Sequence, residues 1–396
     1  MKIRLAALAA VPLVAAVAVG ITSASSAASG SPKFTASVKL MALGPINAQG
    51  FSIPSIPVGA QVAVNEINAA GGVGGKKLVL LQCNDNNDPN TGAACAVTAV
   101  KDKVAALVGG LSTVAPQIIP VLERAKIPWV GATPVGNYSS PILYLSGDTA
   151  PAAYAAAGEI LVKKGCQKIA IISDDTPPST GSDAFLKAGI EFLKGDFVGQ
   201  FTAPQNVADW APTVAAAQAA GADCIGLGTG PPESGPVITA IRQTGKPTQI
   251  SALSGGLPAP VVAQLGPIAN HVLVTGMTLP PTSHSGVVQK VLKAAHALNP
   301  KAPYDAFMAE GYASVEVVAH ALAGLKNVTG ATLIPALNKV KDFNTGVGPV
   351  VTLTKPNSNP TYSRIFDTKV YVWVASGGQF YESQTLNVAP VVATLP

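Results

Sequence analysis

The stretch NAAGGVGGKKLVLLQCND, residues 68–85, places a glycine run between a helix-like segment and an apolar, strand-like segment. A phosphate-binding loop follows a strand and opens a helix, because it presents the free N–H groups of the helix N-terminus to the anion. Here the order is reversed, and the spacing also fails the pattern GxxxxGK[ST]. We therefore interpret residues 71–75 as a left-handed helix cap and a tight turn into the strand, not as a nucleotide site.

Past residue 35, short β-branched runs alternate with longer alanine-rich stretches of helical period, which is the pattern of βαβ units around parallel sheets. The runs are apolar on both faces, as expected for strands covered by helices on two sides. The pattern therefore predicts an α/β protein with two doubly wound parallel-sheet lobes. The predicted strands are VKLMALG (38–44), KLVLLQC (77–83), AALVGG (105–110), PWVGA (128–132), KIAIISD (168–174), VGQFTA (198–203), CIGLGT (224–229), QISALS (249–254) and HVLVTGMTL (271–279), with helices at about 57–70, 91–103, 115–126, 150–164, 181–194, 209–220 and 234–245.

Residues 285–340 break this alternation with consecutive helices, and VGPVVTLT (347–354) and KVYVWVA (369–375) then add late strands. The late strands have no lobe of their own to join, so we expect the chain to cross between lobes more than once and the crossings to form a multi-strand hinge. Crossings are predicted near residues 146–149, 275–280 and 356–362. Lobe 1 then comprises residues 36–147 and 278–357, and lobe 2 comprises residues 148–277 and 358–390.

The first residues have the features of a secretory signal peptide. Lys2 and Arg4 precede an uncharged run over residues 6–21, and small residues follow, so residues 1–28 are predicted to be a signal peptide cleaved near Ala27 or Ala28. The alternative is a membrane anchor, but the run is short of the roughly 20 residues that a span needs. No cysteine precedes Cys83, so no lipid-anchor cysteine is seen. We expect an exported protein, either periplasmic or extracellular at the cell surface.

Composition argues against a nucleic-acid partner. The 396 residues are 48% hydrophobic and 12% charged, and the net charge of +5 is spread without a Lys/Arg cluster. Export makes disulfides possible for the four cysteines. Cys83 ends one strand and Cys95 lies in the next helix. Cys166 immediately precedes the strand KIAII, and Cys224 opens the strand CIGLG, which we expect to be its neighbour. We prefer the pairs Cys83–Cys95 and Cys166–Cys224; free buried thiols or a metal site are the alternatives, although no CxxC motif supports zinc.

Ligands of open parallel sheets lie outside the carboxyl ends of the strands. Five segments at such ends are rich in Gly, Ser, Thr and Pro: GLSTVA (110–115), GATPVG (131–136), DDTPPSTGSD (174–183), GTGPPESG (228–235) and LSGG (253–256). Loops of α/β proteins carry these residues in any case, so a single segment is a weak signal. Together the five segments suit hydrogen bonding to a ligand through backbone and hydroxyl groups. Tyr138 and Trp129 are candidates for an apolar wall, although Trp129 lies in a predicted strand and fits the core better.

Residues 40–85, including LGPINAQG and GAQVAVNEINAAGGVGGKKLVLLQCND, resemble the leader segment of type I periplasmic binding proteins of the branched-chain amino-acid type. GGLSTVAPQIIPVLERAKIPWVGATP (109–134) and KIAIISDD…GSDAFLKAGIEFL (168–193) resemble later segments, and the match covers about residues 36–380. The resemblance implies two α/β lobes joined by three hinge strands that close on a small ligand. It implies a monomeric solute-binding protein of an ABC importer, with a membrane permease as partner.

By the same resemblance, Ser112 or Thr113 and the pair Ala132–Thr133 hold the carboxylate of the ligand. In lobe 2 the family's aromatic residues fall near Thr180 and Gly230, and its acidic partner for the ligand ammonium falls near residues 253–254, where Ser254 stands. None of these positions is aromatic or acidic. A buried ammonium needs a carboxylate partner. The sequence therefore predicts a carboxylate, amino-acid or amide ligand, and it does not decide whether the ligand carries an amine. Glu233 and Asp175 either replace the missing acid or are ordinary loop acids.

An enzyme and a ligand-sensing module for a membrane receptor are the alternative functions. No GxSxG, SxxK or HExxH motif is present, and the four histidines are scattered. The stretch NDNNDPNTG (84–92) fails the calcium-loop pattern. We predict no catalytic residue, no metal and no cofactor. The fold by itself does not separate transport from sensing.

Overall fold

The computed structural model describes residues 32–49, 51–131, 133–176, 179 and 181–396. The predicted signal peptide and its cleavage site lie outside the described residues. Residues Lys33–Pro396 form one compact unit. In this described part, no helix is long and apolar enough to cross a membrane.

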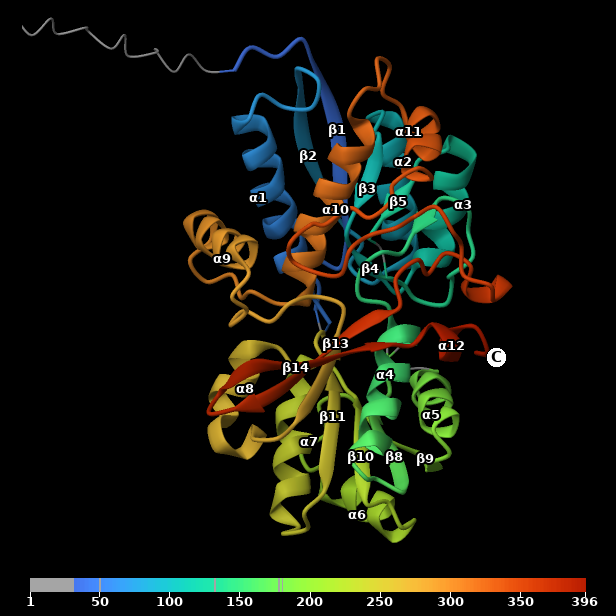
Figure 1. Cartoon of the computed structure of the whole chain (residues 1–396), viewed down its shortest axis with the longest axis vertical. Coiled ribbons are helices and arrows are strands. Elements are labelled where there is room, and N and C mark those ends of the chain that lie inside the picture. The colour runs from blue at the N-terminus through green and yellow to red at the C-terminus, as the bar shows by residue number, and fades with distance from the viewer. Residues whose placement is uncertain (1–31, 50, 132, 177–178, 180) are drawn as a thin grey trace, which may run out of the picture. The chain divides into compact units, whose positions relative to one another are not determined.

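One parallel sheet has the strand order β2-β1-β3-β5-β7 (Figure 1). Helices α1 and α10 cover one face, where Leu40 and Val108 are buried, while α2 and α3 cover the other, where Met41 and Leu107 are buried. Burial on both faces explains why these strands read as continuous apolar runs. The bounds are β1 (Ala36–Gly44), α1 (Ser55–Ala69), β2 (Lys76–Asn84), α2 (Pro89–Lys101), β3 (Ala106–Val108), β4 (Leu111–Ser112), α3 (Ala115–Ala125), β5 (Trp129–Val130), β6 (Thr133–Pro134), β7 (Leu143–Tyr144), α9 (Gly286–Leu298), α10 (Ala306–Leu322) and α11 (Gly330–Leu337).

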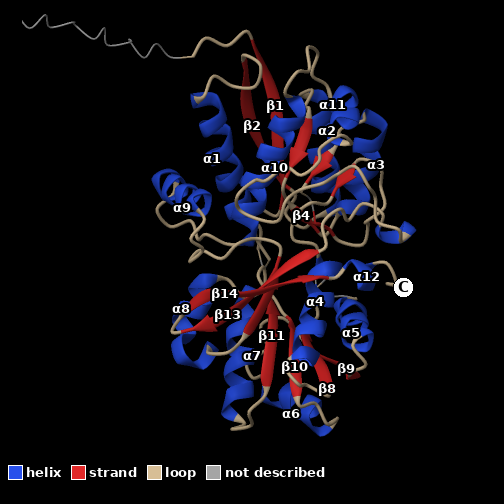
Figure 2. Cartoon of the chain, viewed as in Figure 1, coloured by secondary structure: helices blue, strands red, loops and turns tan. Residues whose placement is uncertain are grey.

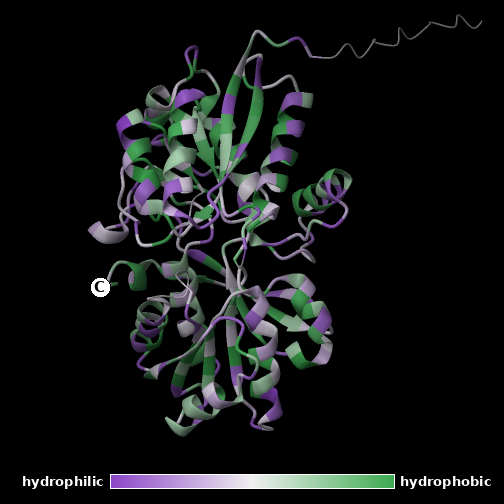
Figure 3. Cartoon of the chain, turned by 180° about the vertical axis from the view of Figure 1, so that it is seen from behind, coloured by the Kyte–Doolittle hydropathy of each residue, from purple (hydrophilic) through white to green (hydrophobic). Residues whose placement is uncertain are grey.

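The second sheet has the order β14-β13-β12-β11-β10-β8-β9, in which β13 and β14 are antiparallel and the others parallel (Figure 2). Its strands also bury both faces, and the apolar residues of both sheets are green in Figure 3. The predicted fold of two doubly wound lobes is confirmed. The bounds are α4 (Ala150–Lys163), β8 (Lys168–Asp174), α5 (Ser182–Phe192), β9 (Asp196–Ala203), α6 (Ala211–Ala219), β10 (Cys224–Gly228), α7 (Pro231–Gln243), β11 (Gln249–Leu253), α8 (Ala259–Leu265), η2 (Gly266–Ala269), β12 (Leu273–Gly276), η3 (Pro360–Tyr362), β13 (Lys369–Ser376), β14 (Gln379–Asn387) and α12 (Ala389–Val392).

The three segments that link the two sheets are hydrogen-bonded to one another. Leu145 N donates to Arg364 O, and Phe366 N donates to Leu145 O, which joins the first segment to the third. Met277 N donates to a carboxylate oxygen of Asp148, which joins the first segment to the second. These contacts fit a hinge in which the three segments act together. The residue boundaries of the lobes given above stay a prediction.

The glycine run ends α1 and turns the chain into β2. Gly72 N donates to Ile67 O at 2.8 Å, and Gly72 adopts a φ of +74°. A Cβ at this position would stand 2.1 Å from Lys76 O, so the turn requires glycine. The glycines therefore form a helix end and turn, as the order of the elements predicts.

The prediction of a strand at residues 347–354 was wrong. Among the described residues of this segment, the backbone pairing is limited to one isolated bridge, between Val351 and Phe343. Pro349 has no N–H to donate to a sheet, and Val351 and Leu353 are buried instead by packing beneath the helices. The late strand at 369–375 is β13, and β14 beside it was missed because its residues are mostly exposed and polar.

Two disulfides join the cysteines in the preferred pairs. Cys83 is bonded to Cys95, and Cys166 is bonded to Cys224, over sequence separations of 12 and 58 residues. Loop closure of these lengths stabilises the folded state by about 3 and about 4 kcal/mol. A carboxylate oxygen of Asp223 lies within 4.8 Å of the sulfur atoms of Cys166 and Cys224, which is the spacing of a metal site. Because both sulfur atoms are in a disulfide, they are not available as thiolate ligands.

Candidate functional site

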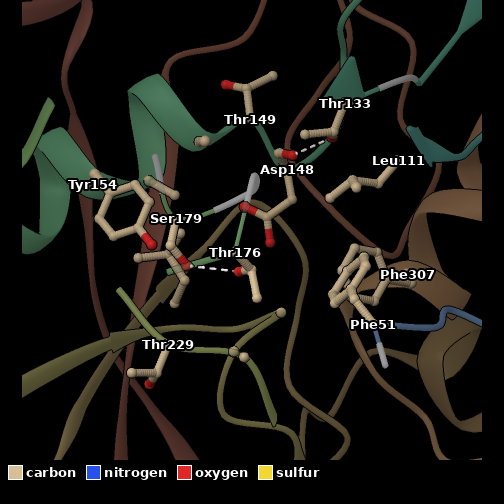
Figure 4. Close-up of a pocket in the computed structure, with 16 residues that line it drawn as sticks. Phe51, Leu111, Thr133, Asp148, Thr149, Tyr154, Thr176, Ser179, Thr229 and Phe307 are labelled. Carbon is tan, nitrogen blue, oxygen red and sulfur yellow. Dashed lines mark hydrogen bonds between the residues drawn. The ribbon is translucent and has the colours of Figure 1, made fainter. Parts of the chain in front are cut away.

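A cavity of about 100 Å³ lies at the carboxyl ends of the strands. One water needs roughly 10–15 Å³, so the space suits a small molecule. Residues from both lobes line it, together with the first linking segment (Figure 4). Leu111 and Thr133 come from the short strand pair β4–β6 of lobe 1, and Leu253 ends β11 of lobe 2. The lining residues are Phe51, Leu111, Thr133, Asp148, Thr149, Ala150, Ala153, Tyr154, Thr176, Ser179, Thr229, Gly230, Leu253, Gly255, Gly256 and Phe307.

One end of the cavity is aromatic. Phe51, from the loop after β1, packs edge-to-face on Phe307, in the first turn of α10, with ring centroids 6.3 Å apart. Leu111 continues this wall. In Figure 4 the phenylalanine pair and Tyr154 stand at opposite ends of the pocket, with Asp148 between them. Aromatic rings offer a large apolar surface, so this end suits the apolar part of a ligand.

Several hydroxyl groups that line the cavity already have hydrogen-bond partners within the protein. Thr133 Oγ1 donates to Asp148 O at 2.6 Å, and Ser179 Oγ donates to Asp174 Oδ1 at 2.6 Å. Thr176 Oγ1 also donates to Asp174, and Thr229 Oγ1 shares a proton with Ser234 Oγ at 2.7 Å. A hydroxyl whose proton is committed can still accept through its lone pairs. These groups therefore present acceptors to the cavity.

Asp148 is the acidic side chain among the described lining residues. Ser254 Oγ donates to one of its carboxylate oxygens, and Met277 N donates to the other at 3.2 Å. Burial raises the pKa of Asp148 to about 6, although both hydrogen bonds favour the ionised form. Asp148 therefore carries a hydrogen-bonded, partly desolvated carboxyl group at the point where the linking segments meet.

Two further buried acids lie behind Asp148. Asp305 caps α10 by accepting from Met308 N at 2.8 Å, and Ser55 Oγ donates to it at 2.9 Å. Glu310 is 2% exposed, and neither of its carboxyl oxygens has a hydrogen-bond partner. Its Cγ would lie 2.9 Å from a Cβ placed on Gly147. Burial, with the charges of Asp148 and Asp305, raises the pKa of Glu310 well above its usual value.

Of the seven predicted ligand-binding residues, Thr133 and Gly230 line the cavity. Ser254 does not line it but holds the carboxylate of Asp148. Ala132 and Thr180 lie outside the described residues. Ser112 and Thr113 are not brought to the cavity, because their hydroxyls donate to Asp85 at 2.7 Å and to Asn87 at 3.2 Å.

The other candidates for the site lie elsewhere. Trp129 is fully buried in β5, and Tyr138 packs against Phe185 and Tyr362, so neither forms a wall of the cavity. Asp175 is exposed and accepts from Gln205 N. Glu233 is buried beside Asp174 without lining the cavity, and burial raises its pKa.

Sequence reasoning missed Asp148, Phe51 and Phe307. Asp148 falls within the predicted crossing at 146–149, so a titratable residue in a hinge segment was the signal that could have found it. The phenylalanines come from a loop and from a helix far along the chain, and no local pattern links them. Only the packing of α10 beside the first sheet brings Phe307 to Phe51.

Two doubly wound lobes, three linking segments and a cavity lined from both lobes define the class of two-lobe solute-binding proteins. Residues 44–371 match the family model described as periplasmic binding protein, so the chain belongs to the periplasmic binding protein family. It is 27% identical to the Leu/Ile/Val-binding protein homolog 3 of Brucella melitensis, over 83% of this chain and 88% of that protein.

The same fold occurs in solved structures. A fatty acid ABC transporter substrate-binding protein from Thermomonospora curvata has a TM-score of 0.75 at 18% identity, covering 92% of this chain and 96% of the other. A branched-chain amino acid transporter substrate-binding protein from Streptococcus pneumoniae, in complex with isoleucine, has a TM-score of 0.70 at 20% identity, covering 88% and 99%. At these identities the likeness concerns the fold.

The position of Ser112 leads to a prediction about stability. Ser112→Ala should lower the free energy of unfolding by about 1–3 kcal/mol, because one oxygen of the buried Asp85 carboxylate loses its donor, while Asn87 N still donates to the other oxygen. Ligand affinity should stay unchanged. Urea titration and ligand titration measure the two quantities, with Ser139→Ala, at an exposed serine, as the control. Weaker ligand binding at unchanged stability would instead place Ser112 in the site.

Proposed function

We propose that this protein is the exported solute-binding component of an ABC importer and captures a small carboxylate-bearing molecule between its two lobes. The observation that carries the proposal is the cavity, because its walls come from both lobes and from the first segment that links them. A ligand there touches both lobes only when they are closed. Binding therefore shifts the open–closed equilibrium by the difference in affinity between the two states.

The first turn of α4 supports the carboxylate part of the proposal. Thr149, Ala150 and Ala153 line the cavity at the N-terminus of this helix. The first N–H groups of a helix have no partner within it, and the helix dipole favours negative charge there. Pro151 has no N–H, and Ala153 N already donates to Thr149 O, so a ligand carboxylate would meet the N–H of Ala150. The apolar part of the ligand would contact Phe51 and Phe307. The amino-acid ligands named for the relatives have this combination of groups.

The same proposal covers the partner and the cellular location. The closed lobes would present the surface that a membrane permease recognises, the protein would act as a monomer, and export would place it in the periplasm or at the cell surface. We propose binding without chemical change, since Thr133, Ser179 and Thr229 hydrogen-bond to protein groups and, among the described lining residues, no hydroxyl is paired with a histidine or lysine base.

A thermal-shift screen over amino acids, aliphatic and aromatic carboxylates and amides tests the proposal. A ligand that binds only the folded state raises the melting temperature by mass action. Small-angle X-ray scattering of the hit complex should show a smaller radius of gyration than the ligand-free protein. A complete absence of hits, or conversion of a hit into a product, would refute the proposal.

The aromatic wall supplies a sharper form of this test. Phe307→Ala should weaken the hit ligand by about 10-fold or more, because the apolar part of the ligand loses its largest contact surface. Isothermal titration calorimetry measures the change. Phe192→Ala is the matched control, since Phe192 is a 49% exposed phenylalanine on α5. Equal affinities of the two variants would exclude Phe307 from the ligand contact.

A further inference from the structure

A second cavity, here called the side cavity, has walls from α8 and α9, which stand on the same side of the molecule (Figure 1). It measures about 280 Å³, close to the lower end of the roughly 300–1,000 Å³ of drug-sized ligand pockets. Its walls are mainly apolar and include Pro260 and Ala263 of α8, Leu292 of α9, and Pro281 and Pro303 from loops. None of its described lining residues lines the cavity between the lobes.

A small space of about 10 Å³, here called the recess, adjoins the side cavity. The two spaces are neighbours because Ala259, Pro281, Tyr304 and Phe380 line both. Trp373 of β13 also lines the recess. A volume of roughly 10–15 Å³ holds one water, so the recess has room for a single oxygen atom of a ligand.

Two buried hydrogen-bond donors of the recess lack an acceptor. Trp373 is 3% exposed and Tyr304 is 4% exposed, and neither Trp373 Nε1 nor Tyr304 Oη has a hydrogen-bond partner in the described part of the chain. The Trp373 ring packs on Phe380 at a centroid distance of 5.3 Å. Burial, with the charge of Asp305, raises the pKa of Tyr304, so its phenol keeps the proton. Because unpaired buried donors are costly, an acceptor that entered the recess would be favoured.

The other polar side chains of the recess are already engaged. Ser254 Oγ donates to Asp148. The carboxyl group of Asp305 accepts from Met308 N and Ser55 Oγ. The free polar groups of the recess are therefore donors.

The charges around the two spaces favour an uncharged acceptor. Their described lining residues include no lysine, arginine or histidine, whereas Asp305 lines the recess. An anion would be buried there beside a carboxyl group and without a counter-charge, which is costly. A carbonyl oxygen is neutral and has two lone pairs, so it can accept from two donors.

We propose that the side cavity and the recess form a second binding site, for a small uncharged molecule with a carbonyl oxygen and an aliphatic body. The oxygen enters the recess and accepts from Trp373 Nε1 and Tyr304 Oη. The aliphatic body packs against the prolines and Leu292 in the side cavity. This site goes beyond the proposed function, because its residues and its ligand class differ from those of the cavity between the lobes.

The indole N–H signals in proton–nitrogen correlation NMR spectra test the site. The chain has three tryptophans, and Trp373→Phe, or a nuclear Overhauser contact with the Phe380 ring, assigns the signal of Trp373. The probes are 2-hexanone, hexanoate and hexylamine, which share a six-carbon chain and differ in the polar group. The ketone should move the Trp373 signal downfield in a saturable manner. The signal of Trp129, whose Nε1 already donates to Gly109 O, should stay in place.

The three probes separate the ligand classes. Hexanoate should need a concentration at least about 10-fold higher than the ketone for the same shift, because its charge must be desolvated. Hexylamine should not move the signal downfield, since an ammonium group has no acceptor. An equal response to hexanoate and to the ketone would overturn the uncharged class of ligand. A Trp373 signal that millimolar ketone leaves unmoved would mean that the recess holds a buried water only, and would overturn the site.

A single hydroxyl group supplies the matched variant. Tyr304→Phe removes one donor and keeps the ring, so the ketone should bind about 5-fold more weakly. Tyr381→Phe, at a 51% exposed tyrosine of β14, should bind it as the natural protein does. Equal affinity of both variants would overturn the two-donor site. The titration of the natural protein needs no variant, so poor folding of Trp373→Phe or Tyr304→Phe leaves the test decisive. Either result leaves the proposed function standing.

Discussion

Raising the pH from 5 to 8 is expected to lower the melting temperature of the ligand-free protein, and Glu310→Gln is expected to remove a large part of that loss. Glu310 is buried without a hydrogen-bond partner, and burial together with the charges of Asp148 and Asp305 raises its pKa well above the usual value. Burial also raises the pKa of Asp148 and of Asp305 to about 6.

The sign follows from proton linkage. In the unfolded chain these acids titrate near pH 4. In the folded protein the pKa values of Asp148 and Asp305 are raised to about 6, and the pKa of Glu310 is raised well above its usual value. Between these values the folded state binds more protons than the unfolded state. Stability therefore falls as the pH rises through this window. For Asp305, which is partly buried, the shift from 3.8 to about 6 corresponds to at most roughly 3 kcal/mol.

Calorimetric melting curves at pH 5, 6, 7 and 8 measure the effect. Glutamine stays neutral over this range, so the Glu310→Gln curve should be flatter and should lie at or above that of the natural protein at pH 8. Glu191→Gln is the control, because Glu191 is exposed on α5 and pairs with Lys187. Parallel curves for the natural protein and Glu310→Gln would show that the carboxyl group of Glu310 is not the source of the pH dependence.

Gly59→Ala is expected to lower the free energy of unfolding by about 2 kcal/mol or more, although alanine is the better helix former. Helices α1 and α10 cross at Gly59 and Gly311. A Cβ on Gly59 would stand 1.9 Å from Met308 O, and a Cβ on Gly311 would stand 2.3 Å from Ile56 O. The atoms in the way are backbone atoms, so the helices would have to separate. Ligand affinity should also fall, because Phe307 begins α10.

Urea denaturation of Gly59→Ala and of Gly286→Ala makes the comparison. Gly286 opens α9, and a Cβ there meets nothing within 4 Å, so its replacement should leave stability unchanged or slightly raised. Equal stability of both variants would mean that α1 and α10 do not need the close approach at Gly59. Both glycines lie in helices, and they differ in how closely a neighbouring helix approaches them. A difference in stability between the two variants can therefore be assigned to the helix–helix packing at Gly59.

The order of the elements could be read from the sequence. Apolar runs such as KIAIISD are buried on both faces, and the alternation with helices follows from local periodicity, so the doubly wound fold was predictable. The turn at the glycine run after α1 was also predictable from neighbouring residues, because the prediction depended only on whether a helix or a strand came first. The same approach wrongly predicted a strand at residues 347–354, where β-branched residues are buried by side-chain packing and not by strand pairing.

The chemistry of the cavity was decided by the tertiary structure. Asp148 meets Ser254, and Phe51 meets Phe307, only after two sheets and three linking segments are in place. Whether a hydroxyl can donate to a ligand likewise depends on which acceptor lies next to it, as Ser112 beside Asp85 and Thr133 beside Asp148 illustrate. The sequence by itself determined the fold and the edge of the sheets where the cavity lies, because periodicity is a local property. Which charges and donors face the ligand was settled by contacts between residues far apart in the chain, because such contacts arise only from the folded packing.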